Sequence, residues 1–250
     1  MDLQLKGRTA LVTGASMGIG RAIAATLAAE GVKLAVVARR RELLEQLAAE
    51  IVAAGGIAPA IIGADVMAPD SAIRIRDQAL TALGTIEILV NCAGASKPLP
   101  VDAPDDKWDE AMTLNFTRVR QLTHAVLPQM QARRFGRIIN ITGKSEPDRL
   151  NAAFAAKAGI HAWSKGLSKE IGKQGITVNC VAPGRIMSEQ IRRLYPEPER
   201  QALSDTEISV GRYGEPEDVA LMVALLASPR AAYFTGVVIP VDGGLRRYQF

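Results

Sequence analysis

Strand-like and helix-like segments alternate along the whole chain of 250 residues, and this alternation is its most restrictive feature. Apolar runs predict strands near residues 8–13, 33–38, 58–63, 86–91, 136–142, 176–181 and 236–241. Amphipathic segments predict helices near residues 18–30, 40–54, 69–82, 105–133, 150–173 and 215–227. Continuous apolar strands joined by helices form parallel sheets that are covered on both faces. The sequence therefore predicts an α/β fold: a single doubly wound domain of the Rossmann type over residues 1–250, with about seven parallel strands.

One segment, residues 187–210, departs from this regularity. It carries charges and two prolines, Pro196 and Pro198, and its helical pattern is weak. Long excursions of this kind often cover a binding site, so the segment is a candidate lid over a substrate. A solvated surface excursion fits the pattern equally well.

Composition narrows the classes of function. The net charge is +4, but the basic residues are scattered in small groups among acidic ones, and only 4% of residues are aromatic. This distribution of charge and the low aromatic content argue against a nucleic-acid partner. Cys92 and Cys180 lack metal-ligand spacing, so we expect no metal site and interpret both as small buried groups. With no apolar run long enough to span a bilayer and no basic leader, we expect no membrane partner and a cytoplasmic location.

A glycine-rich turn lies between the first predicted strand and the first predicted helix. Gly14, Gly18 and Gly20 have the spacing Gly-x-x-x-Gly-x-Gly. Glycines at such a junction let the backbone turn sharply and approach a diphosphate, which the amides and dipole of the helix start then stabilise. The turn thus predicts a nucleotide diphosphate site at the carboxyl end of the first strand.

Two arginines predict the form of the nucleotide. Arg39 and Arg40 follow the second predicted strand, where an NAD-selective site would need a carboxylate for the ribose hydroxyls. A guanidinium instead binds a 2′-phosphate with paired hydrogen bonds. We therefore expect NADP(H) to be preferred over NAD(H). The alternative is that both arginines merely decorate a solvated helix start and pair with Glu42 or Glu45.

Five further motifs follow the glycine turn in order. They are Asp65-Val66, Asn91-Cys92-Ala93-Gly94, Asn115, Pro183-Gly184 and Val241-Asp242-Gly243-Gly244. Together with the glycine turn, they make the chain closely similar to the classical short-chain dehydrogenases/reductases over essentially its whole length. Among members of that family, the chain most resembles the 3-oxoacyl-acyl-carrier-protein reductases.

The resemblance implies an oxidoreductase with a nicotinamide dinucleotide site and the strand order 3-2-1-4-5-6-7. It also implies a small-molecule or acyl-thioester substrate with a carbonyl or hydroxyl group, and a homo-oligomer, dimer or tetramer, formed through the long fourth and fifth helices. The implied cofactor residues are Gly14, Ser16, Met17, Gly18 and Ile19 at the diphosphate, Asp65 and Val66 at the adenine, Asn91, Ala93 and Gly94 at the ribose, Lys157, and Pro183, Gly184, Ile186 and Ser188 near the nicotinamide.

The implied active site is incomplete. The family carries Tyr-x-x-x-Lys, in which the tyrosine is the general acid; here Lys157 is the lysine, but Ala153 stands four positions before it. Asn115 and Lys157 match the family pattern. The family's serine has two candidates, Thr142 and Ser145.

Three hypotheses follow from this departure. The first is a reductase with a substitute acid, for which Lys144, Ser145 and Tyr195 are candidates. The second is a cofactor-binding protein with little turnover, acting as a sensor or subunit. The third is another reaction on a bound carbonyl compound. The retained lysine and asparagine favour an enzyme. His161 is interpreted as a packed or interface residue, and no partner is inferred for His124.

Overall fold

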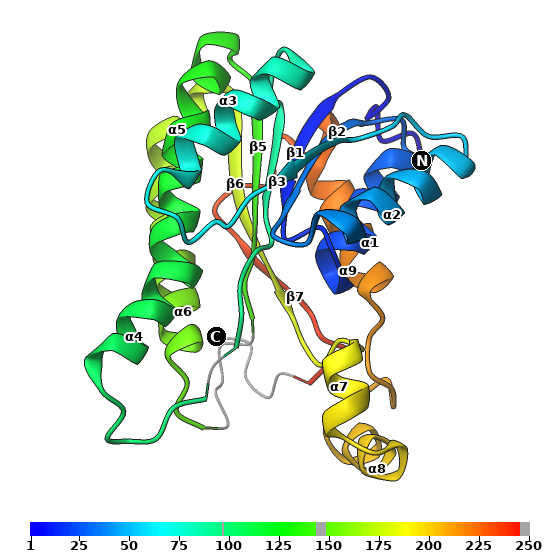
Figure 1. The fold of residues 1–250 in the computed structure, drawn as a ribbon, viewed down its shortest axis with the longest axis vertical. Helices are drawn as coiled ribbons and strands as arrows, with labels where there is room; N and C mark the ends of the chain where they lie inside the picture. Colours follow the sequence, from blue (N-terminus) through cyan, green and yellow to red (C-terminus); the bar gives the residue numbers. More distant parts are fainter. Residues whose placement is uncertain (97, 144–148, 246–250) are drawn as a thin grey trace.

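The computed structural model describes residues 1–96, 98–143 and 149–245, and its strands form one parallel sheet (Figure 1). The sheet has seven strands, as the sequence predicts, in the order β3-β2-β1-β4-β5-β6-β7 that the family resemblance implies. Their bounds are β1 Thr9–Thr13, β2 Lys33–Ala38, β3 Ala60–Gly63, β4 Ile88–Asn91, β5 Gly136–Ile141, β6 Ile176–Pro183 and β7 Val238–Val241. This is the doubly wound Rossmann-type architecture.

Helices cover both faces of the sheet (Figure 1). One face carries α1, α2 and α9, and the other carries α3, α5 and α6. The helices of the described residues are α1 Gly18–Ala29, α2 Arg41–Ala53, α3 Ser71–Leu83, α4 Asp105–Met112, α5 Arg118–Arg133, α6 Ala152–Ile171, α7 Glu189–Leu194, α8 Glu197–Glu207 and α9 Pro216–Ala227.

The core has two parts because successive residues of a strand point to opposite faces. On β4, Ile88 and Val90 join the cluster beneath α1 and α9, whereas Leu89 joins the cluster beneath α3 and α5. All three side chains are fully buried. This two-sided burial explains why the strands are continuous apolar runs in the sequence.

Two predicted segments differ from the structure. The helix expected over residues 105–133 is broken by a π-helical turn, Thr113–Thr117, which separates α4 from α5. Residues 187–210 are not irregular, because they contain α7 and α8. Ser188 caps α7 by accepting a hydrogen bond from the Ile191 amide at 3.1 Å.

The strand order reverses beside β1, which pairs with β2 on one side and with β4 on the other. In such sheets the crevice beyond the carboxyl ends of these strands is where ligands bind. The glycine turn follows β1, and the turn at residues 91–94 follows β4. Both motifs therefore lie at the reversal point.

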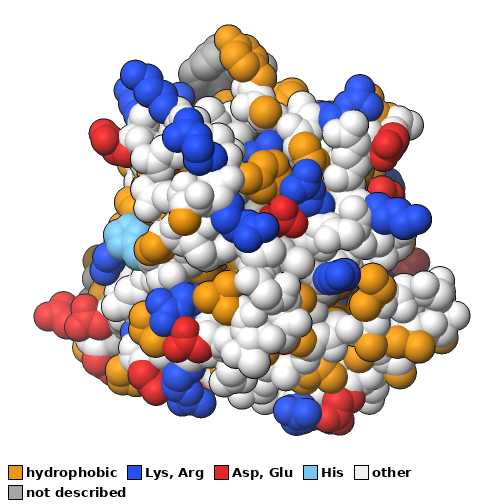
Figure 2. Space-filling model, turned by 90° about the horizontal axis from the view of Figure 1, so that it is seen from above, with side chains coloured by type: hydrophobic (Ala, Val, Ile, Leu, Met, Phe, Trp, Pro, Cys, Tyr) orange, Lys and Arg blue, Asp and Glu red, His pale blue; other side chains and the backbone are white. Residues whose placement is uncertain are grey.

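The exterior offers no helix that is both long and apolar enough to span a membrane, within the part of the chain that the structure describes. Seen from above, Lys and Arg side chains are scattered over the surface, with acidic side chains among them (Figure 2).

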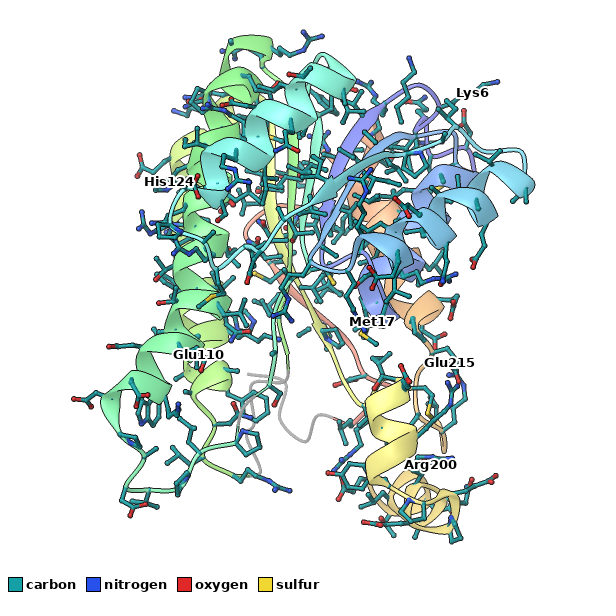
Figure 3. All side chains as sticks on the ribbon, in the orientation of Figure 1. Lys6, Met17, Glu110, His124, Arg200 and Glu215 are labelled. Carbon is teal, nitrogen blue, oxygen red and sulfur yellow. The ribbon has the colours of Figure 1, made fainter. Side chains whose placement is uncertain are left out.

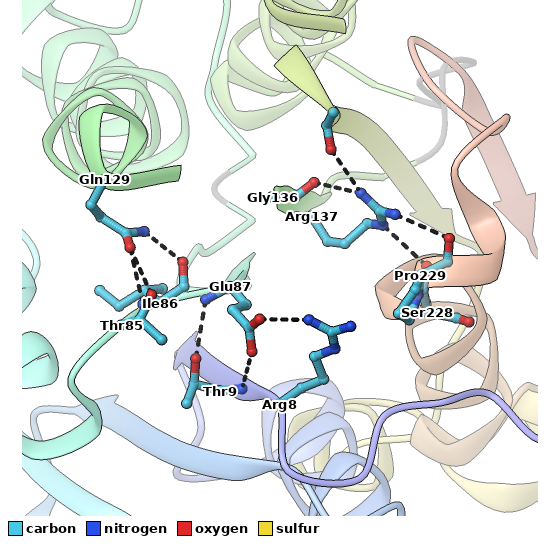
Figure 4. Close-up of polar contacts among 11 residues, drawn as sticks. Arg8, Thr9, Thr85, Ile86, Glu87, Gln129, Gly136, Arg137, Ser228 and Pro229 are labelled. Atoms are coloured by element: carbon cyan, nitrogen blue, oxygen red, sulfur yellow. Dashed lines mark hydrogen bonds and ion pairs between the residues drawn. The ribbon is translucent and has the colours of Figure 1, made fainter. Parts of the chain in front are cut away.

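The buried guanidinium of Arg137 stabilises the sheet near the start of β5 (Figure 4). The Arg137 side chain on β5 is only 2% exposed, and it donates to the carbonyl oxygens of Ser228, Gly136, Gly175 and Pro229 at 2.9–3.2 Å. Burial, together with the nearby charge of Arg8, lowers the pKa of Arg137 to about 10, so the guanidinium stays charged at neutral pH.

We expect the Arg137→Met substitution to lower the free energy of unfolding by about 2–4 kcal/mol, because it leaves buried carbonyls without a donor. Urea denaturation measures this loss. Arg74→Met is the control, because Arg74 is an exposed arginine paired with Asp70 on α3. That substitution should change the unfolding free energy by less than ~0.5 kcal/mol. Equal losses in the two variants would contradict the account.

Candidate functional site

The glycine turn packs directly against the turn that follows β4. Gly14 has φ of +71°, and a Cβ atom placed on it would lie 2.9 Å from the backbone of Ala93. A Cβ atom on Gly20 would overlap the carbonyl oxygen of Gly14. Only glycine fits both positions, which explains two of the three glycines.

The buried Thr13 hydroxyl joins the same two turns. It accepts hydrogen bonds from the amides of Cys92 at 3.1 Å and Ala93 at 3.2 Å, and it donates to the Val90 carbonyl at 3.4 Å. This role was not predicted. The only signal in the sequence was a hydroxyl residue at the very end of the first strand.

The start of α1 is suited to an anion. Met17 is the N-cap residue, its side chain accepts no capping hydrogen bond, and the first turn has no acidic residue. The first amides of a helix lack partners within the helix, and the dipole makes this end positive. By contrast, α9 begins with a capping box of Glu215 and Asp218. The backbone of Ser16, Met17, Gly18 and Ile19 thus surrounds a site where a diphosphate would be stabilised.

The arginines after β2 lie beside this turn. The Nη2 atom of Arg40 is 2.7 Å from the Sδ atom of Met17, and both side chains are exposed. Arg39 is also exposed. Among the described residues, the ion pair to Glu45 comes from Arg41, at 2.9 Å. Arg40 therefore contacts the glycine turn and does not form the helix-surface pair considered above.

The predicted adenine and ribose residues also lie near the strand reversal. Asp65 caps its own turn, since its Oδ1 atom accepts from the Met67 amide at 2.9 Å. Val66, Asn91 and Ala93 line a cavity of about 20 Å³, together with Thr13. Asp65 therefore caps the turn that follows β3, and Val66 lies beside Asn91 and Ala93, two of the residues predicted at the ribose.

The segment after β6 reaches the same end of the sheet. Gly184 packs so closely that a Cβ atom on it would lie 2.6 Å from the Cβ atom of Asp242, and Ile186 bridges to Gly214. A larger cavity of about 240 Å³ separates the starts of α1, α7 and α9. Figure 3 shows Met17, before the start of α1, and Glu215, before the start of α9, near α7. The lining residues are Gly18, Arg21, Ala22, Met187, Ser188, Glu189, Arg192, Glu215, Pro216 and Glu217.

Lys157 extends from α6 to the end of β5. Its Nζ atom donates to the Thr142 carbonyl oxygen at 2.8 Å. Burial lowers the pKa of the Lys157 amine, and the nearby Cys92 thiol acts in the opposite direction. Burial raises the pKa of Cys92 to about 12, so the thiol remains protonated at neutral pH. Cys92 is only partly buried by exposed area, unlike Cys180.

His161 is a site contact that the sequence reasoning missed. It was interpreted as a packing residue, but its Nε2 atom lies 2.9 Å from the Oγ1 atom of Thr142. Thr142 Oγ1 also donates to the Val181 carbonyl at 3.1 Å. In the tautomer that carries a proton on Nε2, His161 donates to Oγ1 while the hydroxyl donates to Val181. The spacing of four residues from Lys157 places His161 on the same helix face and was the available signal.

A chain of buried polar side chains underlies the site and was also missed. Asn91 Nδ2 donates to Asn140 Oδ1 at 2.8 Å and to Thr123 Oγ1 at 3.1 Å. Asn140 in turn donates to Ser164 at 3.0 Å. These bonds connect β4, β5, α5 and α6. His124, for which no partner was predicted, lies beside Trp163, with ring centroids 6.1 Å apart.

The remaining predicted catalytic residues have different outcomes. Asn115 is 3% exposed and bonds the backbone of Ala95 and Ala111, which stabilises the π-helical turn. A Cβ atom on Gly94 would lie 2.9 Å from Asn115 Oδ1. Lys144 and Ser145 lie outside the described residues. Tyr195 follows α7, and its carbonyl accepts from Arg200 at 2.6 Å.

The fold is that of the Rossmann-type dinucleotide-binding proteins, and comparison with known proteins defines the family. The family described as Enoyl-(Acyl carrier protein) reductase matches residues 14–246. The chain is 39% identical over 248 residues to the 3-oxoacyl-acyl-carrier-protein reductase of Pseudomonas aeruginosa, a match that covers 97% of this chain and 99% of that protein. The chain therefore belongs to the classical short-chain dehydrogenase/reductase family of NAD(P)-dependent oxidoreductases.

Solved structures agree with this assignment. L-sorbose reductase from Gluconobacter frateurii, complexed with NADPH and L-sorbose, superposes with a TM-score of 0.93 at 29% identity, covering 99% of this chain and 100% of that one. A 7α-hydroxysteroid dehydrogenase complexed with NADH and 7-oxo glycochenodeoxycholic acid gives 0.92 at 30% identity, covering 97% and 96%.

We expect the Thr13→Val substitution to accelerate hydrogen exchange at the amides of Cys92 and Ala93. The isosteric change removes the acceptor of both amides, and an unpaired buried donor costs about 1–3 kcal/mol. Exchange measured by NMR tests this directly. Thr81→Val, which removes an exposed hydroxyl on α3, is the control. Unchanged exchange at both amides would show that the Thr13 hydroxyl does not join the turns.

Proposed function

We propose that this protein is an NADP(H)-dependent oxidoreductase that acts on the carbonyl or hydroxyl group of a small molecule or acyl thioester. One observation carries the proposal: the uncapped, acid-free start of α1 meets a glycine turn that admits close backbone approach, and the Arg40 guanidinium lies beside that turn. Diphosphate and 2′-phosphate are the anions that this arrangement fits.

The chain's own residues fit the dinucleotide. The amides from Ser16 to Ile19 would hold the diphosphate, Asp65 and Val66 the adenine, and Asn91, Ala93 and Gly94 the adjacent ribose. Pro183, Gly184, Ile186 and Ser188 would border the nicotinamide, and Lys157 would hold its ribose. When bound, the reduced nicotinamide supplies a hydride. The protein must orient the substrate and provide a proton to the carbonyl oxygen.

Residues 187–210 form the proposed lid. Met187, Ser188 and Glu189 line the same cavity as Gly18 and Arg21, so this segment faces the glycine turn. Movement of α7 would open or close the cavity. The names of the related proteins cover acyl-thioester, sugar and steroid substrates, so the fold alone does not select among these classes.

We also propose a homo-oligomer, a dimer or tetramer, formed through α5 and α6. The small apolar side chains of Ala155, Ala158 and Ala162 are exposed along one face of α6, which allows a second helix to approach closely.

The cofactor preference is tested by replacing the arginines one at a time. We expect Arg39→Asp and Arg40→Asp to weaken NADPH binding by about tenfold to a hundredfold, since a hydrogen bond to a charged group contributes about 1.5–3 kcal/mol. NADH binding should be unchanged or tighter. Calorimetric titration gives both constants. Arg41→Asp is the adjacent control. An unchanged ratio of the two affinities in both variants would contradict the assignment.

Turnover is tested by following NADPH absorbance with ketones, 3-oxoacyl thioesters and quinones. We expect oxidation of NADPH with at least one of these classes. NADPH binding without oxidation across the whole panel would favour the alternative of a binding protein with little turnover. The alternative has support in Ala153, which is buried and offers no proton donor where the family carries tyrosine.

A further inference from the structure

We propose that Lys157 itself donates the proton to the substrate oxygen. The inference rests on the proposed reductase function and concerns only the source of the proton. Three features of the site support it: the side chains facing Lys157, the number of its free N–H groups, and the rigidity of its anchor.

Among the described residues, neither the position one turn before Lys157 on α6 nor the position across from it carries a proton donor. Ala153, one turn earlier on the same helix face, is 1% exposed and has only a methyl group. Across from Lys157, Gly143 has no side chain at all, and an ideal Cβ atom there would lie 3.7 Å from Cδ and 3.9 Å from Nζ of Lys157. Nothing from residue 143 therefore separates the amine from the space beyond it.

The ammonium group has donors to spare. A lysine ammonium carries three N–H groups. One of them donates to the Thr142 carbonyl oxygen at 2.8 Å. Two remain, which is enough for one hydrogen bond to a ribose hydroxyl and one to a carbonyl oxygen.

Two residues, Val181 and His161, hold the anchor of the amine in place. The Thr142 amide donates to the Val181 carbonyl at 2.8 Å, and its hydroxyl donates to the same oxygen at 3.1 Å. His161 Nε2 contacts that hydroxyl at 2.9 Å. His161 is thus a positioning residue, because its contact with the Thr142 hydroxyl helps to hold the residue whose carbonyl anchors Lys157.

The environment also adjusts the acidity of the amine. Burial lowers its pKa, which makes the ammonium a stronger acid than an exposed lysine. Among the described residues, the titratable groups at this point are Cys92, after β4, and His161, on α6 itself. Only the charged form of Cys92 raises the pKa of Lys157, and burial raises the pKa of this thiol to about 12, so the thiol is neutral near pH 7.

The step balances as follows. The carbonyl carbon accepts the hydride, and the electron pair of the carbonyl π bond moves onto the oxygen. That oxygen takes a proton from Lys157 Nζ, so an O–H bond forms and an N–H bond breaks. The neutral amine then regains a proton from water.

The experiment compares Lys157→Arg, Lys157→Ala and Lys169→Arg in the full-length protein. Arginine keeps the positive charge and the N–H donors but does not release a proton, since its pKa exceeds 12. We expect kcat for NADPH-dependent reduction to fall by about 10²–10⁴ in Lys157→Arg, with the NADPH Kd changed less than ~10-fold (one hydrogen bond at most). Primary amines added to Lys157→Ala should restore turnover, with rates that depend on the amine pKa. Lys169, an exposed lysine on the same helix, is the control.

A second measurement needs no turnover. The rate at which Lys157 reacts with an acylating reagent, followed across pH by peptide mass spectrometry without cofactor, gives its pKa. We expect a value below that of Lys169 in the same protein. Equal values would overturn the inference.

The outcomes separate the two proposals. Turnover that survives in Lys157→Arg overturns the inference alone. If Lys144→Ala or Tyr195→Phe then loses turnover, that residue is the proton donor instead. Wild-type protein that binds NADPH but reduces no carbonyl compound overturns both the inference and the proposed function.

Discussion

The contact between the turn after β1 and the turn after β4 is the constraint on which the site depends. Gly14 and Ala93 approach so closely that no side chain fits between them. The Thr13 hydroxyl holds the second turn by two backbone amides. This contact fixes the start of α1 at the point where the strand order reverses. The start of α1 and the turn that follows β4 therefore meet at the carboxyl ends of the strands.

A chain of buried hydrogen-bonded side chains fixes the opposite side of the site. The polar chain from Asn91 through Asn140 to Ser164 connects β4, β5 and α6 inside the sheet. Buried polar groups of this kind are stable only when they are paired, so their bonds define one arrangement of these elements. Lys157 and Thr142 occupy the end of that arrangement. The glycine turn and Lys157 are thus positioned by separate sets of contacts.

Much of the fold followed from the sequence, because strand burial on two faces leaves a continuous apolar signal. The glycine turn was also recognisable in the sequence, because the backbone packs too closely at Gly14 and Gly20 for any residue with a Cβ atom. The π-helical turn was not predicted, because it depends on Asn115 bonding the backbone of a separate loop at Ala95. The helices α7 and α8 were also missed. In α8 only Ser204 is buried, so its sequence carries little apolar periodicity.

Only part of the candidate site was predicted, because contacts between elements that are distant in the sequence leave no local pattern. Family motifs indicated where a dinucleotide would bind, but pairs such as His161 with Thr142 arise only when α6 packs on β5. A structure of the protein crystallised with NADPH tests the central claim most directly. The account predicts diphosphate oxygens within hydrogen-bonding distance of the amides at residues 16–19, with Lys157 facing the nicotinamide ribose. A nucleotide bound away from the glycine turn, or none bound at millimolar NADPH, would contradict it.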